Sequence, residues 1–163
     1  MICIIYVIFS FILDGFISNY INYSINDISY FNTIYTIISL ILVYDYFINK
    51  KKYFFLVLTI SILFDIVYTG TILINTLLFF IIYEITIFID KLLPPNIITI
   101  NIKCLVGIFS YYTLSLLLFI IFQFNNYELY LLWELLLRSI IMTITYTSIS
   151  YLVLNIIVKN KIK

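Results

Sequence analysis

Long apolar stretches alternate with short polar breaks along the chain, and this pattern predicts six membrane-spanning helices. A helix needs about 20 residues to cross the hydrocarbon core of a bilayer, and most of the stretches approach or exceed that length. The breaks include the polar segment 19–29, the lysine triplet 50–52, a turn at Gly70 and the pair Pro94 and Pro95. The predicted spans cover residues 2–21, 30–48, 53–68, 72–89, 98–122 and 130–158.

The composition favours the same class of protein. The 163 residues are 64% hydrophobic and 10% charged, whereas soluble domains are roughly half apolar and a quarter charged. Six spans would use most of the chain, so we expect one polytopic domain over residues 1–163. The first stretch lacks the basic start and small-residue cleavage site of a signal peptide and is interpreted as a retained helix. The expected fold is an all-α integral membrane protein, built as a bundle of six transmembrane helices.

The lysine positions predict the orientation, because cytoplasmic loops of membrane proteins are enriched in lysine and arginine. With both termini in the cytoplasm, the outer loops contain no lysine and carry the acids Asp27 and Glu128 instead. The single arginine, Arg138, falls inside the sixth span. The lysines of the cytoplasmic segments are then Lys50, Lys51, Lys52, Lys91, Lys103, Lys159, Lys161 and Lys163.

Ionisable side chains inside the spans are the candidate functional residues, since a charge at the bilayer centre costs about 3 kcal/mol on insertion scales. Glu134 and Arg138 are four residues apart and share one helical face, so they can form an ion pair. Asp14 and Asp65 fall at a similar depth in the first and third spans. One hypothesis is a polar cluster of these four residues that joins helices one, three and six. The alternative is an ion pair within one helix, with each aspartate reaching headgroups or water.

The remaining acids of the spans differ in depth. Asp45 lies near the cytoplasmic end of the second span, beside the lysine triplet, and Asp90 adjoins Lys91. Both are interpreted as interfacial residues, because side chains near a helix end can extend to the headgroups. Glu84 lies deeper in the fourth span with no cation at its level, and it is interpreted as a membrane-buried acid of unknown role.

Several kinds of chemistry are excluded or disfavoured by what the sequence lacks. The chain has no histidine, which excludes imidazole acid–base catalysis and histidine-bearing zinc sites. It also lacks the usual nucleotide-binding and hydrolase motifs. Cys3 and Cys104 do not have the spacing of a metal site or a disulfide framework, and a net charge of +1 gives no basis for nucleic-acid binding. We therefore expect no enzyme activity, no catalytic residues, and no cofactor or metal.

The junction between the third and fourth spans resembles a known family element. Residues 61–77 read SILFDIVYTGTILINTL, which is similar to the GLLLD element, followed by hydrophobic residues and a glycine, of the bacterial rod shape-determining protein MreD. Asp65 and Gly70 occupy the aspartate and glycine positions of that motif. The chain length, the six predicted spans, the short loops and a last helix with an arginine and a basic tail also look like MreD.

The resemblance implies a non-enzymatic scaffold that crosses the cytoplasmic (inner) membrane of a bacterium several times. MreD proteins belong to the cell-elongation machinery, the elongasome, which maintains rod shape and supports side-wall peptidoglycan synthesis. The implied partner is an MreC-like bitopic membrane protein. The implied indirect partners are MreB filaments, RodA and a class B penicillin-binding protein.

The MreD fold is similar to that of the substrate-binding subunits of energy-coupling-factor vitamin transporters, and this likeness gives the alternative function. Such a subunit would bind a vitamin near the outer surface and dock on its transporter through small residues, alanine above all. The chain has no alanine and three glycines, which disfavours this alternative because close helix packing in membranes uses small residues.

Overall fold

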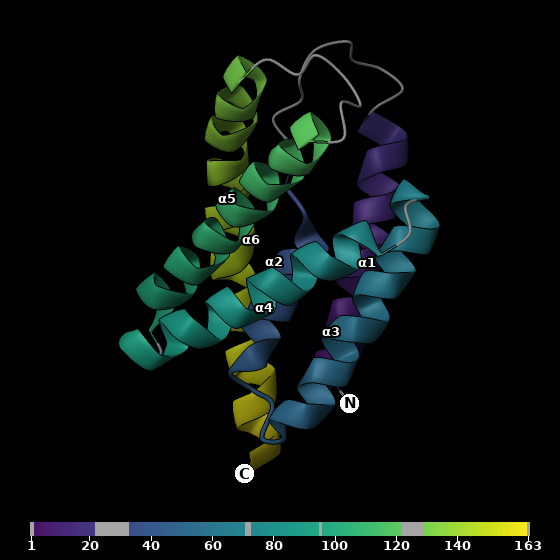
Figure 1. Ribbon diagram of the computed structural model, residues 1–163. Helices are drawn as coiled ribbons and strands as arrows, with labels where there is room; N and C mark the ends of the chain where they lie inside the picture. The colour runs from purple at the N-terminus through teal and green to yellow at the C-terminus, as the bar shows by residue number, and fades with distance from the viewer. Residues whose placement is uncertain (1, 22–32, 71–72, 95, 122–128, 163) are drawn as a thin grey trace.

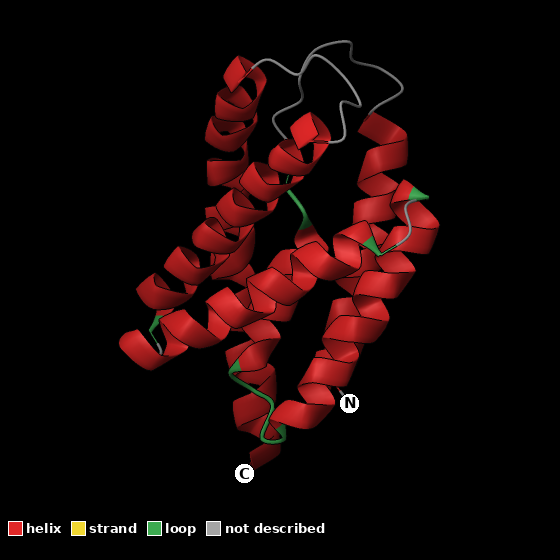
Figure 2. Cartoon of the chain, in the orientation of Figure 1, coloured by secondary structure: helices red, strands yellow, loops and turns green. Residues whose placement is uncertain are grey.

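The structure, a computed structural model, describes residues 2–21, 33–70, 73–94, 96–121 and 129–162. Within these ranges the chain forms helices and short connections and contains no strand, which confirms the expected all-α class (Figure 2). The elements are α1 (Ile2–Ile21), α2 (Tyr35–Tyr44), α3 (Lys50–Phe64), the π-helix η1 (Asp65–Thr69), α4 (Ile74–Leu92), α5 (Ile97–Ile121) and α6 (Leu129–Ile162).

Among the described residues, three helical segments are long and apolar enough to cross a membrane. They are Lys50–Thr69, Ile97–Leu118 and Ser139–Ile157. Each of the six predicted stretches contains a helix, whereas the prediction that all six cross the bilayer stays a prediction. The second stretch differs most from its expected length, since α2 has 10 residues. At 1.5 Å per residue α2 is about 15 Å long, roughly half of the hydrocarbon thickness.

Helix α2 lies inside the bundle, behind α4 in Figure 1 and beside α1, α5 and α6. All ten of its residues are buried. The helix begins at Tyr35 after extended backbone at Ile34, and its first residues are buried, so its N-terminus lies in the protein interior. A helix leaves its first backbone N–H groups without partners inside the helix. Within a bilayer such groups need acceptors from the protein, because water is absent.

Small hydroxyl residues allow the helices to approach each other in a chain without alanine. Ser10 of α1 is hydrogen-bonded to Tyr146 of α6 at 2.9 Å, and the hydroxyls of Thr33 and Thr143 are also 2.9 Å apart. Serine and threonine pack closely in membrane helices, and their hydroxyls bond across helices or to their own backbone. The buried members of this set are Ser10, Thr33, Thr36, Ser39, Ser61, Thr86, Thr99, Ser139, Thr143, Thr147 and Ser150.

The beginning of α1 and the end of α6 lie at the same end of the molecule (Figure 1). The lysine-rich start of α3 lies at this end as well. The predicted orientation puts both termini and the lysine triplet 50–52 on one side of the membrane, and it stays a prediction.

Helix α1 approaches η1 closely at Gly15. A Cβ atom on Gly15 would lie 2.6 Å from the hydroxyl oxygen of Tyr68 and 2.8 Å from its ring atom Cε1. The same hydroxyl donates a hydrogen bond to the backbone oxygen of Phe11, at 2.5 Å. We expect Gly15→Ala to lower the free energy of unfolding by about 1 to 3 kcal/mol, because the rigid Tyr68 ring has to move away from α1.

Unfolding in a detergent titration followed by circular dichroism measures this effect. Gly107→Ala is the matched control, since its Cβ would lie 2.5 Å from only the terminal methyl of Ile41, which a rotamer change can move. We expect Gly107→Ala to lower the free energy of unfolding by less than Gly15→Ala does. Equal stability of Gly15→Ala and the wild type would contradict the close approach.

Candidate functional site

Asp14 of α1 binds the buried N-terminus of α2. Its Oδ1 accepts a hydrogen bond from the backbone N–H of Tyr35 at 2.8 Å. Its Oδ2 accepts hydrogen bonds from the backbone N–H of Thr36 at 2.8 Å and from the Thr36 hydroxyl at 2.5 Å. The residue before the helix, Ile34, has no side chain that can cap it, so a carboxylate from another helix takes the role of the N-cap.

Asp65, the first residue of η1, binds the N-terminus of α4 in the same way. Its Oδ1 accepts hydrogen bonds from the backbone N–H and the side-chain amide of Asn75, at 3.0 and 3.1 Å. Its Oδ2 accepts hydrogen bonds from the backbone N–H and the hydroxyl of Thr76, at 2.9 and 2.7 Å. Asp65 is 2% exposed. Its carboxylate is therefore buried together with the donors that stabilise it.

The two aspartates make the same kind of interaction with a helix N-terminus. Each carboxylate bonds two successive backbone N–H groups at the start of a helix, and a threonine hydroxyl supplies a further donor at the second position. The N-terminus of a helix carries a partial positive charge, which stabilises an anion. Backbone donors thus compensate a buried negative charge in a region where a lone carboxylate would be costly. The same bonds hold α1 to α2 and η1 to α4.

The backbone around Asp65 is unusual over a short distance. Residues Asp65–Thr69 form a π-helix, a wider turn that is rare and is common at functional sites. The π-helix ends at Gly70, which has a left-handed φ of 60°. Glycine adopts this conformation without steric strain because it has no Cβ atom. Leu73, directly before α4, also has a left-handed φ of 63°. This costs a leucine about 1 to 2 kcal/mol, and the bonds from Asp65 to Asn75 and Thr76 help to hold the turn.

The polar network extends from Asp65 to α5. The Tyr111 hydroxyl donates a hydrogen bond to the side-chain oxygen of Asn75 at 2.7 Å. Two of the four members of the predicted cluster, Asp14 and Asp65, thus bind the N-termini of two different helices, α2 and α4. The side chains of the other two, Glu134 and Arg138, lie outside the described residues.

A second ionic site joins α2, α4 and α5 near the end of the bundle that carries the termini. The ammonium of Lys103 is 3.2 Å from Asp45 and 2.5 Å from Asp90, and the lysine side chain is 1% exposed. Lys50 lies beside this site, with its ammonium bonded to the backbone oxygen of Tyr44 and 3.5 Å from the centre of the Tyr44 ring. The site therefore combines two cations with two carboxylates.

Sequence reasoning did not anticipate the partner of these two aspartates. It interpreted Asp45, beside the lysine triplet, and Asp90, beside Lys91, as interfacial residues, whereas both pair with Lys103 in the structure. A signal was available in the Pro94 break, because a short turn between two helices brings the end of the first close to the start of the second. Asp90 lies in the last turn of α4 and Lys103 lies in the second turn of α5, so the hairpin aligns them.

Glu84 is exposed on the outer side of α4. It has no hydrogen bond or ion pair with the described part of the chain. The sequence prediction concerned its depth along the fourth span; the structure adds that the side chain points away from the bundle interior.

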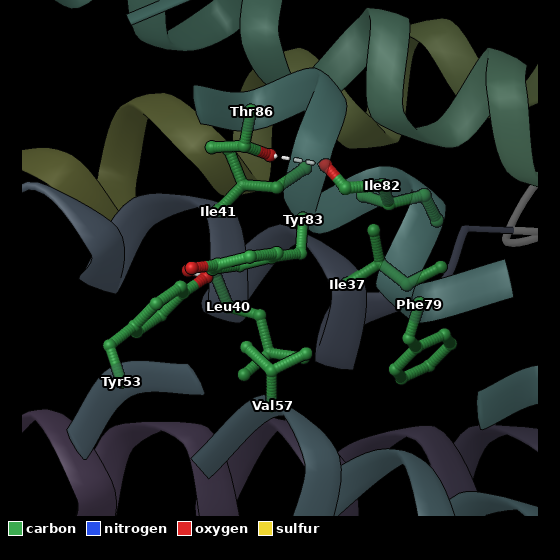
Figure 3. Close-up of a pocket in the computed structure, with 9 residues that line it drawn as sticks. All are labelled: Ile37, Leu40, Ile41, Tyr53, Val57, Phe79, Ile82, Tyr83 and Thr86. Atoms are coloured by element: carbon green, nitrogen blue, oxygen red, sulfur yellow. Dashed lines mark hydrogen bonds between the residues drawn. The ribbon is translucent and has the colours of Figure 1, made fainter. Parts of the chain in front are cut away.

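Figure 3 shows a pocket between α2, α3 and α4 that is filled by its own side chains. Its free volume is about 10 Å³, the space of a single water molecule at most. The rings of Tyr53 and Tyr83 stack across it at 5.8 Å, and the hydroxyl of Thr86 donates to the backbone oxygen of Ile82. This pocket has no room for a vitamin. No cluster of three or more metal-ligating side chains lies within the described ranges.

Comparisons with family models, with curated proteins and with solved structures gave no match.

Proposed function

We propose that the chain is a non-enzymatic scaffold of the bacterial cell-elongation machinery. In this proposal it crosses the cytoplasmic membrane several times and binds an MreC-like bitopic protein. Through that partner it would connect MreB filaments to RodA and a class B penicillin-binding protein, and so support side-wall peptidoglycan synthesis and rod shape.

The main support is the position of the two residues that carry the resemblance to MreD. Asp65 caps α4, and Gly70 ends the π-helix with a left-handed φ. Each residue type is required by its geometry, since a carboxylate bonds both N–H groups and glycine adopts positive φ without strain. Both motif residues therefore lie where the local geometry favours their residue types, and this supports the proposal.

The use of the polar residues gives further support. Asp14 and Asp65 hold helix ends, and Lys103 holds Asp45 and Asp90. Their hydrogen-bonding capacity is directed within the protein, which suits a rigid membrane scaffold. Large apolar side chains cover much of the surface, as expected for contacts with lipid or with partner helices.

Depletion of the protein in a rod-shaped host tests the proposed function. We expect the cells to become round, and we expect the tagged protein to copurify with a bitopic membrane protein that has a periplasmic coiled coil. A complementing copy of the wild-type gene should restore the rods. Gly107→Ala, which changes only a contact with a flexible side chain, is a suitable variant to show that a folded mutant also restores them.

The alternative function predicts different results. A vitamin-binding subunit would copurify with paired ATPases, and its melting temperature would rise with the concentration of the vitamin. Rod-shaped cells that require a vitamin after depletion would contradict the scaffold proposal.

A further inference from the structure

An exposed face of α4 combines apolar side chains with one acid. Leu77, Phe80, Glu84 and Phe88 are spaced by three or four residues, so they lie on one side of the helix. Leu77, Phe80 and Phe88 are 55%, 46% and 64% exposed, and Glu84 is also exposed. We refer to these four residues as the α4 face.

The α4 face continues into a groove between α3 and α4. The groove has a volume of about 300 Å³, and Leu77 and Phe80 line it together with residues of α3. From α3 it is lined by Phe54 and Leu58, with the buried hydroxyl of Ser61. A helix packed along the α4 face could place side chains into this groove, as ridges of one helix pack into grooves of another.

Glu84 distinguishes this face from an ordinary lipid-facing surface. It lies six residues, or about 9 Å, from Asp90 and ten residues, or about 15 Å, from the start of α4. The other acids whose side chains are described, Asp14, Asp45, Asp65 and Asp90, all have partners within the chain. In the predicted fourth span, a carboxyl group among apolar side chains is costly in lipid, which offers it no donor. A donor from another protein removes that cost.

We infer that the α4 face binds a single membrane-spanning helix of a second protein, and that this helix carries a lysine or arginine opposite Glu84. The inference rests on the proposed function in one respect, because a bitopic partner supplies such a helix. A second copy of this chain fits less well, since a two-fold contact through this face would bring two Glu84 carboxylates together.

A model helix tests the inference without knowledge of the natural partner. The probe is a labelled peptide of about 20 leucines and alanines with one central lysine, and the matched peptide has methionine at that position. Energy transfer to the full-length protein, labelled at its C-terminus, is measured in phosphatidylcholine vesicles. We expect the lysine peptide to bind about tenfold more tightly than the methionine peptide, the effect of one interhelical polar contact.

Substitutions of Glu84 make the test specific. Glu84→Gln should lose most of the preference for lysine, and Glu84→Lys should prefer a peptide with a central glutamate. Both variants should fold, because Glu84 makes no bond within the described chain. The control is the double variant Glu84→Gln, Ile12→Glu, which places a carboxyl on the exposed face of α1 instead. It should not restore the preference for the lysine peptide over the methionine peptide.

Two results would overturn the inference. One is equal binding of the lysine peptide to the wild type and to Glu84→Gln. The other is rapid disulfide formation between two Phe88→Cys chains in vesicles, which would show that a second copy covers the α4 face. Neither result affects copurification with an MreC-like protein, so failure of this inference is distinguishable from failure of the proposed function.

Discussion

Lys103→Met should be among the most destabilising single substitutions of a polar residue, lowering the free energy of unfolding by about 3 to 5 kcal/mol. The ammonium of Lys103 lies within 3.5 Å of carboxylate oxygens from both Asp45 and Asp90. Methionine has a similar length but no charge, so it would leave two carboxylates close together without their buried cation. Chemical unfolding in detergent, followed by circular dichroism, measures the loss.

Neutralising the carboxylates should restore most of this stability. In the triple variant Lys103→Met, Asp45→Asn, Asp90→Asn, no buried charge remains to be compensated, and such replacements are often close to neutral.

For Lys103→Met alone, the loss of stability should be smaller at about pH 5 than at about pH 8, because protonation of one carboxylate relieves the repulsion between Asp45 and Asp90. Lys52→Met, at an exposed lysine, is the control and should change stability by less than about 0.5 kcal/mol. A Lys103→Met protein as stable as this control would contradict the buried site.

The hydrophobic pattern was sufficient to locate the helices but not to predict the length of α2. The second stretch is apolar over residues 30–48, whereas α2 covers only Tyr35–Tyr44. Its start is set by a carboxylate of α1, 21 residues earlier in the chain. Hydropathy reports how well a segment tolerates lipid, and it contains no information on a bond between two separate helices.

The partners of the charged residues show the same limit. The sequence predicted that Asp14 and Asp65 need compensation, either from Arg138 in a cluster or from headgroups or water. The structure adds a contribution that neither hypothesis named, the backbone N–H groups at the start of another helix, which no sequence pattern marks. Thr36 and Thr76 gave a weak signal, since a threonine near the start of a helix often takes part in capping. The pairing of Asp90 with Lys103 was accessible from the helical hairpin around Pro94.

Asp65→Ala should lower the free energy of unfolding by about 3 kcal/mol or more. It removes the acceptor of the backbone N–H groups of Asn75 and Thr76. Each buried donor left without a partner costs about 1 to 3 kcal/mol, so the loss of two exceeds the roughly 1 kcal/mol that is typical of a helix cap. Helix α4 should lose its first turn, so hydrogen exchange at residues 75–78 should accelerate more than exchange in the middle of α4.

Graded substitutions separate the cap from a general effect of the Asp65 charge. Asp65→Asn keeps one carbonyl oxygen as an acceptor and should lose less stability than Asp65→Ala. Thr76→Val removes only the hydroxyl donor at 2.7 Å and should cost about 1 kcal/mol. Asp14→Ala should produce the same kind of local opening in α2, because Asp14 binds Tyr35 and Thr36 in the same way. If Asp65→Asn were as destabilising as Asp65→Ala, the charge and not the capping geometry would be the dominant contribution of Asp65.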